Sequence, residues 1–240
     1  MRILVTNDDS VSASGLLPLV RFCQTLGDVT VVVPKFEQSG KSHGIELHKS
    51  FECKQVQLCD DVTVWTVDST PADCVRFAIL GLEIKFDLVI SGINRGYNIG
   101  ADQIYSGTVG AACEAVALGV PAVALSTSPA YYPHAHEQLE KVWNFITEKK
   151  LLEMHPLYNV NIPLEPKGIC LTRQGDAYFT DSFDKLDDTH YKQNGYCIHV
   201  NQGDLTVDTD ATISGYVSVT PLSIRRDDRV AFELASKNLK

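Results

Sequence analysis

Two adjacent carboxylates, Asp8 and Asp9, follow directly on the apolar residues 3–5, where the first strand of the chain is predicted to end. Ligands of open parallel sheets bind outside the carboxyl ends of the strands, and two like charges repel each other unless a cation lies between them. A divalent metal ion therefore explains the pair. The alternative is a solvated turn, because Asn, Asp and Ser are common turn residues.

Further oxygen donors lie in loops that follow later predicted strands. The Ser39 hydroxyl belongs to the polar loop 38–42, and the Asn94 amide belongs to the glycine-punctuated loop 91–98. Together with the two aspartates they form a set of hard oxygen donors, which suits magnesium, manganese or calcium better than zinc or copper. Their spacing in the sequence does not by itself prove that they converge.

The tripeptide Ser106-Gly107-Thr108 is predicted to open a helix. A helix start offers free backbone N–H groups and a positive dipole end, which together can hold a phosphoryl group. The alternative is an ordinary serine N-cap. The run 40–42, Gly-Lys-Ser, resembles the end of a P-loop, but the chain has no complete G-x-x-x-x-G-K-[ST] motif, which disfavours NTP hydrolysis of that kind.

The segments that must position these residues alternate between strands and helices. Apolar residues at helical spacing predict helices, and short, unalternating β-branched runs predict strands that are covered on both faces. The predicted helices span residues 15–27, 70–81, 106–119 and 134–152, and the predicted strands span residues 29–33, 62–67, 86–90, 121–125, 159–162 and 169–172. This alternation is typical of an α/β fold with a parallel sheet.

Beyond Gly175 the pattern changes to short alternating segments. A β-hairpin is predicted from residues 196–200 and 205–207 around a turn at 202–204, with a further strand at 216–220. We interpret this region as an arm or dimerisation element. The chain is accordingly divided into a catalytic core at 1–180, a β-hairpin oligomerisation arm at 181–222 and a C-terminal segment at 223–240.

The composition excludes several classes of protein. The 240 residues are 44% hydrophobic and carry a net charge of −9, without a basic run dense enough to follow a phosphate backbone. Duplex nucleic acid is therefore not an expected partner, whereas a small phosphate ester remains compatible with a bound metal ion and a helix N-terminus.

The cellular compartment is predicted from apolar runs and cysteines. The N-terminal apolar stretch is too short for a signal peptide, and no later run of about 18 apolar residues occurs, so we expect a cytoplasmic protein that does not bind membranes. The seven cysteines form no C-x-x-C pair, and their number is odd. They are expected to be reduced thiols, mostly in the core, rather than zinc ligands.

Several motifs, taken in order, resemble those of the SurE family. The resemblance runs from residue 3 to about 222 and is carried by Asn7-Asp8-Asp9 with Gly15-Leu16, Gln38-Ser39-Gly40-x-Ser42, Thr70-Pro71-Ala72-Asp73-Cys74, Ser91-Gly92-Ile93-Asn94-Arg95-Gly96-x-Asn98, Tyr105-Ser106-Gly107-Thr108-Val109-Gly110-Ala111-Ala112 and Gly215-Tyr216-Val217-Ser218-Val219-Thr220-Pro221-Leu222. Each piece is weak, but the joint pattern with compatible spacers is highly specific.

The resemblance implies a divalent-metal-dependent 5'-nucleotidase with a Rossmann-like core and a C-terminal β-hairpin arm exchanged between subunits of a homodimer or homotetramer. It implies one metal ion per subunit, magnesium or manganese, with calcium also able to bind. The implied substrates are nucleoside 5'-monophosphates, and 3'-monophosphates and polyphosphate in some members. The implied metal ligands are Asp8, Asp9, Ser39 and Asn94.

The expected mechanism is metal-assisted hydrolysis of a phosphomonoester, in which the catalytic residues Asp8 and Asp9 hold the ion and one of the two carboxylates orients a water for in-line attack. A haloacid-dehalogenase-type mechanism fits less well, because it uses a D-x-D pair and the acids here are adjacent. The residues expected to bind substrate and phosphate are Ser39, Gly40, Asn94, Asn98, Ser106, Gly107 and Thr108.

The chain departs from the family pattern at three places. The family usually has glycine where this chain has Ser10, a small residue near His43-Gly44, and glycine at the position of Ser69. If position 10 needs a positive φ, a non-glycine residue costs roughly 1 kcal/mol and tilts the Asp pair, although the serine hydroxyl could also reach the metal or phosphate. The alternative function is a non-catalytic nucleotide sensor on the same fold.

Overall fold

The computed structural model describes residues 1–59 and 61–238. Its strands are β1 (Arg2–Thr6), β2 (Asp28–Pro34), β3 (Cys53–Val56), β4 (Thr63–Val67), β5 (Leu88–Arg95), β6 (Ala122–Thr127), β7 (Leu157–Ile162), β8 (Ile169–Leu171), β9 (Phe179–Lys185), β10 (Tyr191–Cys197) and β11 (Val217–Pro221). Its helices are α1 (Leu16–Gln24), α2 (Pro71–Arg76), α3 (Gly107–Ala117), α4 (Leu139–Glu148), α5 (Leu151–Met154), α6 (Asp208–Ile213) and α7 (Arg229–Asn238). The π-helical turn η1 (Phe77–Gly81) and the 3-10 segments η2 (Gly100–Tyr105) and η3 (Tyr132–Gln138) complete the list.

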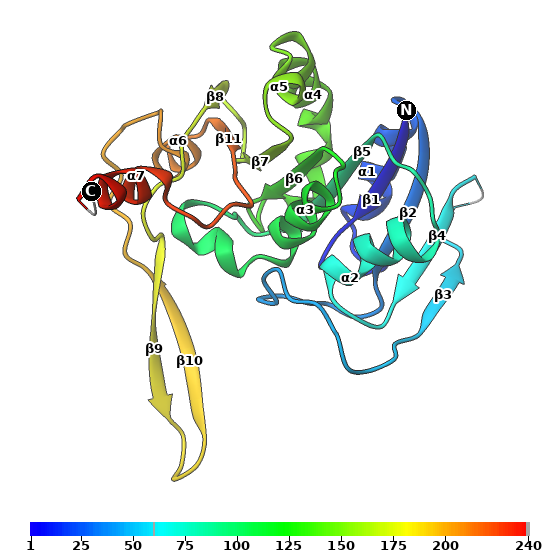
Figure 1. Ribbon diagram of the computed structural model, residues 1–240, viewed down its shortest axis with the longest axis horizontal. Coiled ribbons are helices and arrows are strands. Elements are labelled where there is room, and N and C mark those ends of the chain that lie inside the picture. The colour runs from blue at the N-terminus through cyan, green and yellow to red at the C-terminus, as the bar shows by residue number, and fades with distance from the viewer. Residues whose placement is uncertain (60, 239–240) are drawn as a thin grey trace.

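The centre of the molecule is a sheet with the strand order β3-β4-β2-β1-β5-β6-β7-β11-β8 (Figure 1). The strands from β4 to β7 are all parallel, whereas β3 and β11 pair antiparallel to their neighbours β4 and β7. The chain starts at β1, builds outward through β2, and then restarts at β5 on the other side of β1. The topological switch point therefore lies between β1 and β5, which is where open α/β sheets bind ligands.

Helices cover both faces of the sheet, as expected for strands without alternating polarity. On one face, Ile3 and Val5 of β1 pack in a cluster with α1 and α4. On the other face, Leu4 of β1 packs in a cluster with α2 and α3. Successive side chains of a strand point to opposite faces, so β1 contributes to both cores. The predicted α/β class with a mostly parallel core is confirmed.

The predicted start of the helix at residue 70 is confirmed by its cap. Thr70 accepts a hydrogen bond from Asp73 N at 3.1 Å and Pro71 occupies the first turn of α2. The predicted helix at 70–81 continues from α2 into the π-helical turn η1. The predicted helix at 134–152 is divided into η3, α4 and α5, because Lys150 adopts a left-handed conformation with φ of 53° between the last two.

The C-terminal hairpin exists, but its predicted position is wrong. Strands β9 and β10 pair antiparallel from Phe179↔Cys197 to Lys185↔Tyr191, whereas the prediction placed the strands at 196–200 and 205–207. The turn lies at 186–190, where an Asp187 carboxylate oxygen accepts hydrogen bonds from the backbone of Thr189 and His190.

The segment 202–204, predicted as the hairpin turn, instead binds the side chain of Asp210. Gln202 N and Asp204 N both donate to Oδ2 of the buried Asp210 on α6, at 3.0 and 2.9 Å. This loop is therefore anchored to a helix that the sequence did not predict. No turn is assigned at 202–204, and the partner of this loop is a side chain rather than a second strand.

The interval 181–222, predicted as an arm, contains more than the hairpin. Strand β11 lies inside it, yet β11 is part of the central sheet between β7 and β8. Strands β9 and β10 project from the body as a long hairpin, as Figure 1 shows (yellow to orange). At the hairpin root, an Asp102 carboxylate oxygen accepts hydrogen bonds from Tyr178 N at 2.9 Å and Phe179 N at 2.7 Å.

Within the described residues, no helix combines the length and the apolar character needed to cross a membrane.

Candidate active site

Several predicted site residues converge at the switch point of the sheet. Asp8 and Asp9 follow β1, and Asn94 lies near the end of the adjacent strand β5. The loop after β2 is tied to this edge, because Gln38 N donates to the backbone oxygen of Asp8 at 2.8 Å. Ser39 is the next residue of that loop. The four expected donors, from three separate segments, are therefore gathered by parallel strand ends, which meet at one edge of a sheet.

Asp8 is a buried carboxylate with a rigid setting. Its residue is only 4% exposed, and its Oδ1 accepts a hydrogen bond from the hydroxyl of Thr108 on the first turn of α3. Burial raises the pKa of Asp8 from about 3.8 to about 6; the Thr108 hydrogen bond opposes this and the nearby charge of Asp9 adds to it. A buried acid that resists ionisation is stabilised when a cation sits beside it.

Asp9 lies closer to the surface. Its Oδ2 accepts a hydrogen bond from Arg95 N at 3.3 Å. Burial also raises the pKa of Asp9, and the negative charge of Glu37 adds to that rise, whereas the Arg95 backbone and guanidinium oppose it. Through this contact the end of β1 is connected directly to the end of β5, which carries Asn94; the predicted strand at 86–90 therefore extends into the segment expected to be a loop.

The start of α3 approaches Asp8 very closely, and Gly107 makes this approach feasible. A Cβ atom at position 107 would lie 3.0 Å from Cβ of Asp8 and 3.1 Å from its Oδ2. A Cβ atom there would push Asp8 or the helix start aside by a few tenths of an ångström, so glycine allows this close approach. The positive end of the helix dipole and the Asp8 charge face each other at this contact.

The donor set fits a hard divalent cation. The Asn94 side chain donates from Nδ2 to Gly96 O at 2.9 Å, and no donor to its Oδ1 is found among the described residues. Ser39 Oγ donates its proton to Glu37 Oε1 at 2.6 Å, so its lone pairs remain available. Two carboxylates, an amide oxygen and a hydroxyl match the ligands preferred by magnesium, manganese and calcium.

The remaining predicted substrate residues differ in whether their polar groups already bond to other protein groups. Ser106 caps α3 by accepting from Val109 N at 3.1 Å, and the Thr108 hydroxyl is engaged by Asp8. These hydroxyls are therefore used by the protein, and the backbone N–H of Thr108 also interacts with Asp8. The N–H of Gly107, for which no acceptor is found among the described residues, is what remains for a phosphoryl group. Gly40 has φ of 71° and faces open space, while Asn98 Nδ2 donates to Ser126 Oγ at 2.8 Å.

Position 10 has the positive φ considered from the sequence. Ser10 adopts φ of 75°, is buried, and its backbone oxygen accepts from Asn7 Nδ2 at 2.9 Å. Its hydroxyl pairs with Ser12 Oγ at 2.9 Å. The left-handed conformation is thus imposed on a non-glycine residue next to the aspartate pair, and the hydroxyl is used locally.

A buried charge cluster near the site was missed from the sequence. Glu114 on α3 is 6% exposed and contacts His43 Nε2 at 2.6 Å and Arg76 Nη1 at 2.7 Å. These contacts, led by the His43 hydrogen bond, lower the pKa of Glu114. A single acid on a helix otherwise made of small residues was the signal that could have revealed it.

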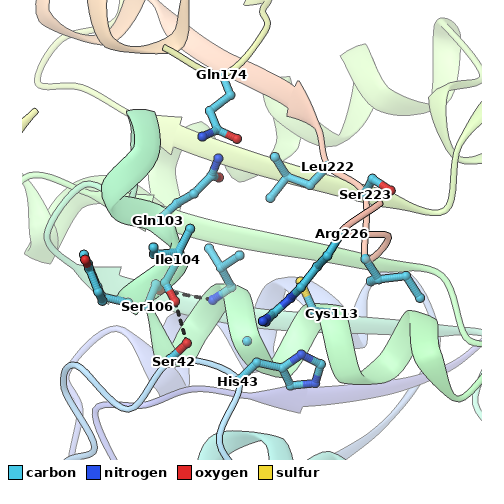
Figure 2. Close-up of a pocket in the computed structure, with 14 residues that line it drawn as sticks. Ser42, His43, Gln103, Ile104, Ser106, Cys113, Gln174, Leu222, Ser223 and Arg226 are labelled. Atoms are coloured by element: carbon cyan, nitrogen blue, oxygen red, sulfur yellow. Dashed lines mark hydrogen bonds between the residues drawn. The ribbon is translucent and has the colours of Figure 1, made fainter. Parts of the chain in front are cut away.

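A cavity of about 460 Å³ opens beside Ser106 at the start of α3, and Asp8 is not among the residues that line it (Figure 2). Its walls come from the loop after β2, from η2, from the first turns of α3 and from residues 222–226. The volume lies within the range of pockets that hold small organic ligands. The site thus combines a cluster of hard oxygen donors, a helix start and an adjoining pocket.

Comparison with known proteins gives consistent matches over the chain. The family model described as "Survival protein SurE" matches residues 3–181. The 5'-nucleotidase SurE of Thermosipho melanesiensis is 39% identical over 237 residues, covering 93% of this chain and 92% of the relative. The 5'-nucleotidase SurE of Pelotomaculum thermopropionicum is 37% identical over 257 residues, covering 100% and 96%. The crystal structure of the SurE protein from Aquifex aeolicus aligns with a TM-score of 0.78 at 33% identity, covering 100% of both chains.

Proposed function

This chain belongs to the SurE family, and we propose that it is a 5'-nucleotidase that hydrolyses nucleoside 5'-monophosphates with one divalent metal ion held by Asp8, Asp9, Ser39 and Asn94. The observation that carries the proposal is the meeting of the buried Asp8 carboxylate with the start of α3. A cation site and an anion site then lie side by side, which is what a phosphomonoester requires.

The protein residues divide the work of the reaction. A divalent ion, when bound, supplies positive charge to the phosphoryl oxygens and lowers the pKa of a water molecule. Thr108 holds the Asp8 carboxylate in one orientation, and Arg95 N does the same for Asp9. The Gly107 N–H at the α3 start receives a phosphoryl oxygen, and its fixed direction lowers the cost of reorganisation. The aspartates orient the attacking water for in-line displacement.

Magnesium and manganese are the proposed ions, since both are compatible with carboxylate, amide and hydroxyl oxygens. Activity on 3'-monophosphates and polyphosphate belongs to the same proposal, because the α3 start can bind any terminal phosphoryl group. A cytoplasmic location also remains part of it.

Assembly into a homodimer or homotetramer is proposed from the exposed apolar surface of the hairpin. Phe183 is 65% exposed, Tyr191 60% and Tyr196 54%, and an isolated two-stranded hairpin is marginally stable in water. Packing against a second subunit would remove these side chains from water.

Phosphate release from a panel of nucleotides, with magnesium, with manganese and with EDTA, tests the proposal. We expect hydrolysis that EDTA abolishes and added metal restores. Nucleotide binding without any phosphate release would instead support the alternative, a non-catalytic nucleotide sensor.

A further inference from the structure

The cavity beside Ser106 has no role in the chemistry described above. We propose that it receives the nucleobase of the substrate and that Gln103 Nε2 donates a hydrogen bond to an acceptor on the edge of the base. The inference rests on the proposed function only for the position of the phosphate at the α3 start. From that position the nucleoside can extend to the far side of the helix turn, because Ser106 borders the cavity.

The orientation of the Gln103 amide can be assigned through Asn159, because Asn159 bonds to a backbone carbonyl that can only accept. The backbone oxygen of Asn98 can only accept, and Asn159 Nδ2 donates to it at 2.7 Å. The same Nδ2 donates to Oε1 of Gln103 at 3.1 Å. The oxygen of Gln103 must therefore face Asn159, and its NH₂ group faces the other way.

Gln103 is held firmly in this orientation. The residue is 4% exposed and lines the cavity, and no acceptor for its Nε2 is found among the described residues. The Gln103 side chain has its oxygen hydrogen-bonded and its NH₂ group without an acceptor among these residues. A ligand that supplies an acceptor would satisfy this buried donor. Nucleobases carry ring nitrogens and carbonyl oxygens along their edges, and these are acceptors of the required kind.

The rest of the cavity suits a flat heterocycle. Ile104, Val109 and Leu222 provide aliphatic walls, and burial raises the pKa of the Cys113 thiol to about 11, so that this wall stays neutral. Figure 2 shows Gln174 facing Gln103 at one end of the cavity, with Arg226 and His43 at the other end. Apolar walls with a few fixed polar groups are typical of sites for small ligands.

Gln103 and Gln174 differ in whether they can discriminate a hydrogen-bond donor from an acceptor on the ligand. Gln174 is exposed and no hydrogen bond of its side chain to another described residue is found, so its amide can turn to match either a donor or an acceptor. The Gln103 amide cannot turn without breaking the Asn159 contact. Gln103 is therefore the residue that sets the preference for an acceptor at this place.

The decisive variant is Gln103→Glu. A glutamate keeps an oxygen for Asn159 and nearly the same volume, but it replaces the donor with an acceptor. The measured quantity is the ratio of kcat/KM for nucleoside 5'-monophosphates to kcat/KM for ribose 5-phosphate, which has the phosphate and sugar without the base. We expect this ratio to fall about tenfold or more, mainly through KM, because a buried hydrogen bond is lost.

Three companion variants control the experiment. Gln103→Leu removes the donor without adding charge, and the ratio should fall in the same direction. Ile224→Trp narrows the cavity from an exposed position and should also lower the ratio. Gln55→Glu makes the same chemical change on the exposed edge strand β3 and should leave the ratio unchanged. Unchanged ratios in all three cavity variants would overturn the proposal.

Binding of unphosphorylated nucleosides, measured by calorimetry, separates this proposal from the proposed function. Adenosine and uridine should bind the wild type in the absence of metal, and Gln103→Leu should weaken that binding. If the wild type releases no phosphate but shows this pattern, the proposed function fails and the base pocket stands. If it hydrolyses nucleotides but binds neither nucleoside and the ratios do not change, the base pocket is wrong.

Discussion

The hydroxyl of Thr108, fully buried on the first turn of α3, donates a hydrogen bond to Oδ1 of Asp8. This bond joins the helix start to the carboxylate that follows β1. Thr108→Val removes it at nearly constant volume and leaves an unpaired buried carboxylate oxygen. We expect kcat to fall roughly tenfold or more with a smaller change in KM, measured by phosphate release at saturating metal. Thr108→Ser, which keeps the hydroxyl, should retain most of the activity; equal losses in both variants would contradict this role.

Metal-free stability should depend on pH through Asp8. Its pKa is raised from about 3.8 to about 6 on folding, so the folded state binds this proton more tightly than the unfolded chain. The contribution to stability is fully present below pH 3.8 and is lost as the pH rises through about 6. Asp8→Asn removes this dependence, and in EDTA it should be more stable than the wild type at pH 8 by on the order of 1–3 kcal/mol. Urea unfolding at pH 5 and pH 8 measures it; a stability difference independent of pH would disprove it.

Metal affinity should fall in a defined order. Asp8→Asn and Asp9→Asn each remove a charge from the metal site, whereas Ser39→Ala and Asn94→Ala remove neutral oxygen ligands. Calorimetric titration with manganese should therefore show larger losses for the two aspartate variants. Asn98→Ala is the comparison, because its side chain is directed to Ser126 and is not a proposed ligand. An Asn94→Ala protein with wild-type affinity would remove Asn94 from the ligand set.

Ser10→Gly should stabilise the protein. Position 10 has φ of 75°, which costs a non-glycine residue roughly 1 kcal/mol that glycine avoids. Ser12→Gly is a matched control, because both changes remove the hydrogen bond between the two hydroxyls, and Ser12 is not among the residues with positive φ. We expect Ser10→Gly to be the more stable variant in urea unfolding. The opposite order would show that the strain at position 10 is negligible.

The hairpin should control the assembly state. Tyr178 O accepts a hydrogen bond from Ile198 N at 2.9 Å, so residues 179–197 can be replaced by a short Gly-Ser link between these ends. Because the hairpin exposes its aromatic side chains, we expect the shortened chain to form a smaller species in light scattering. The replacement leaves β11 in the central sheet. An unchanged mass would locate the subunit contact elsewhere.

Features with a local physical cause could be predicted from the sequence. The cap at Thr70 and the β-branched run at 29–33 depend on neighbouring residues, and the structure confirms both. Asp8 and Asn94 were each placed after a predicted strand, but their spacing did not prove that they converge; the parallel pairing of β1 with β5 brings them to one edge of the sheet. Whether these residues bind metal stays a prediction.

Features that depend on distant partners could not be predicted. The hairpin is a different case, because its Asp187 turn is local: residues 186–190 contain no glycine, and the segment 202–204, which contains one, gave the stronger turn signal. The Gln103 orientation depends on Asn159, which is 56 positions away in the sequence. Similarly, the contact between His43 and Glu114 spans 71 positions.

The first turn of α3 separates two spaces, with Gly107 against Asp8 on one side and Gly110 against the backbone of Ser42 on the other. Both glycines allow contacts that a Cβ atom would disturb, so this turn has little freedom to change. The opposite wall of the cavity comes from residues 222–226, which follow the last strand of the central sheet. On the proposed assignment, mutations in that segment can alter which nucleoside is selected while the reacting groups stay in place. The substrate range can therefore change by mutation without a change in the reacting groups. Segment 222–226 is the place where substitutions should alter the selectivity for the nucleoside.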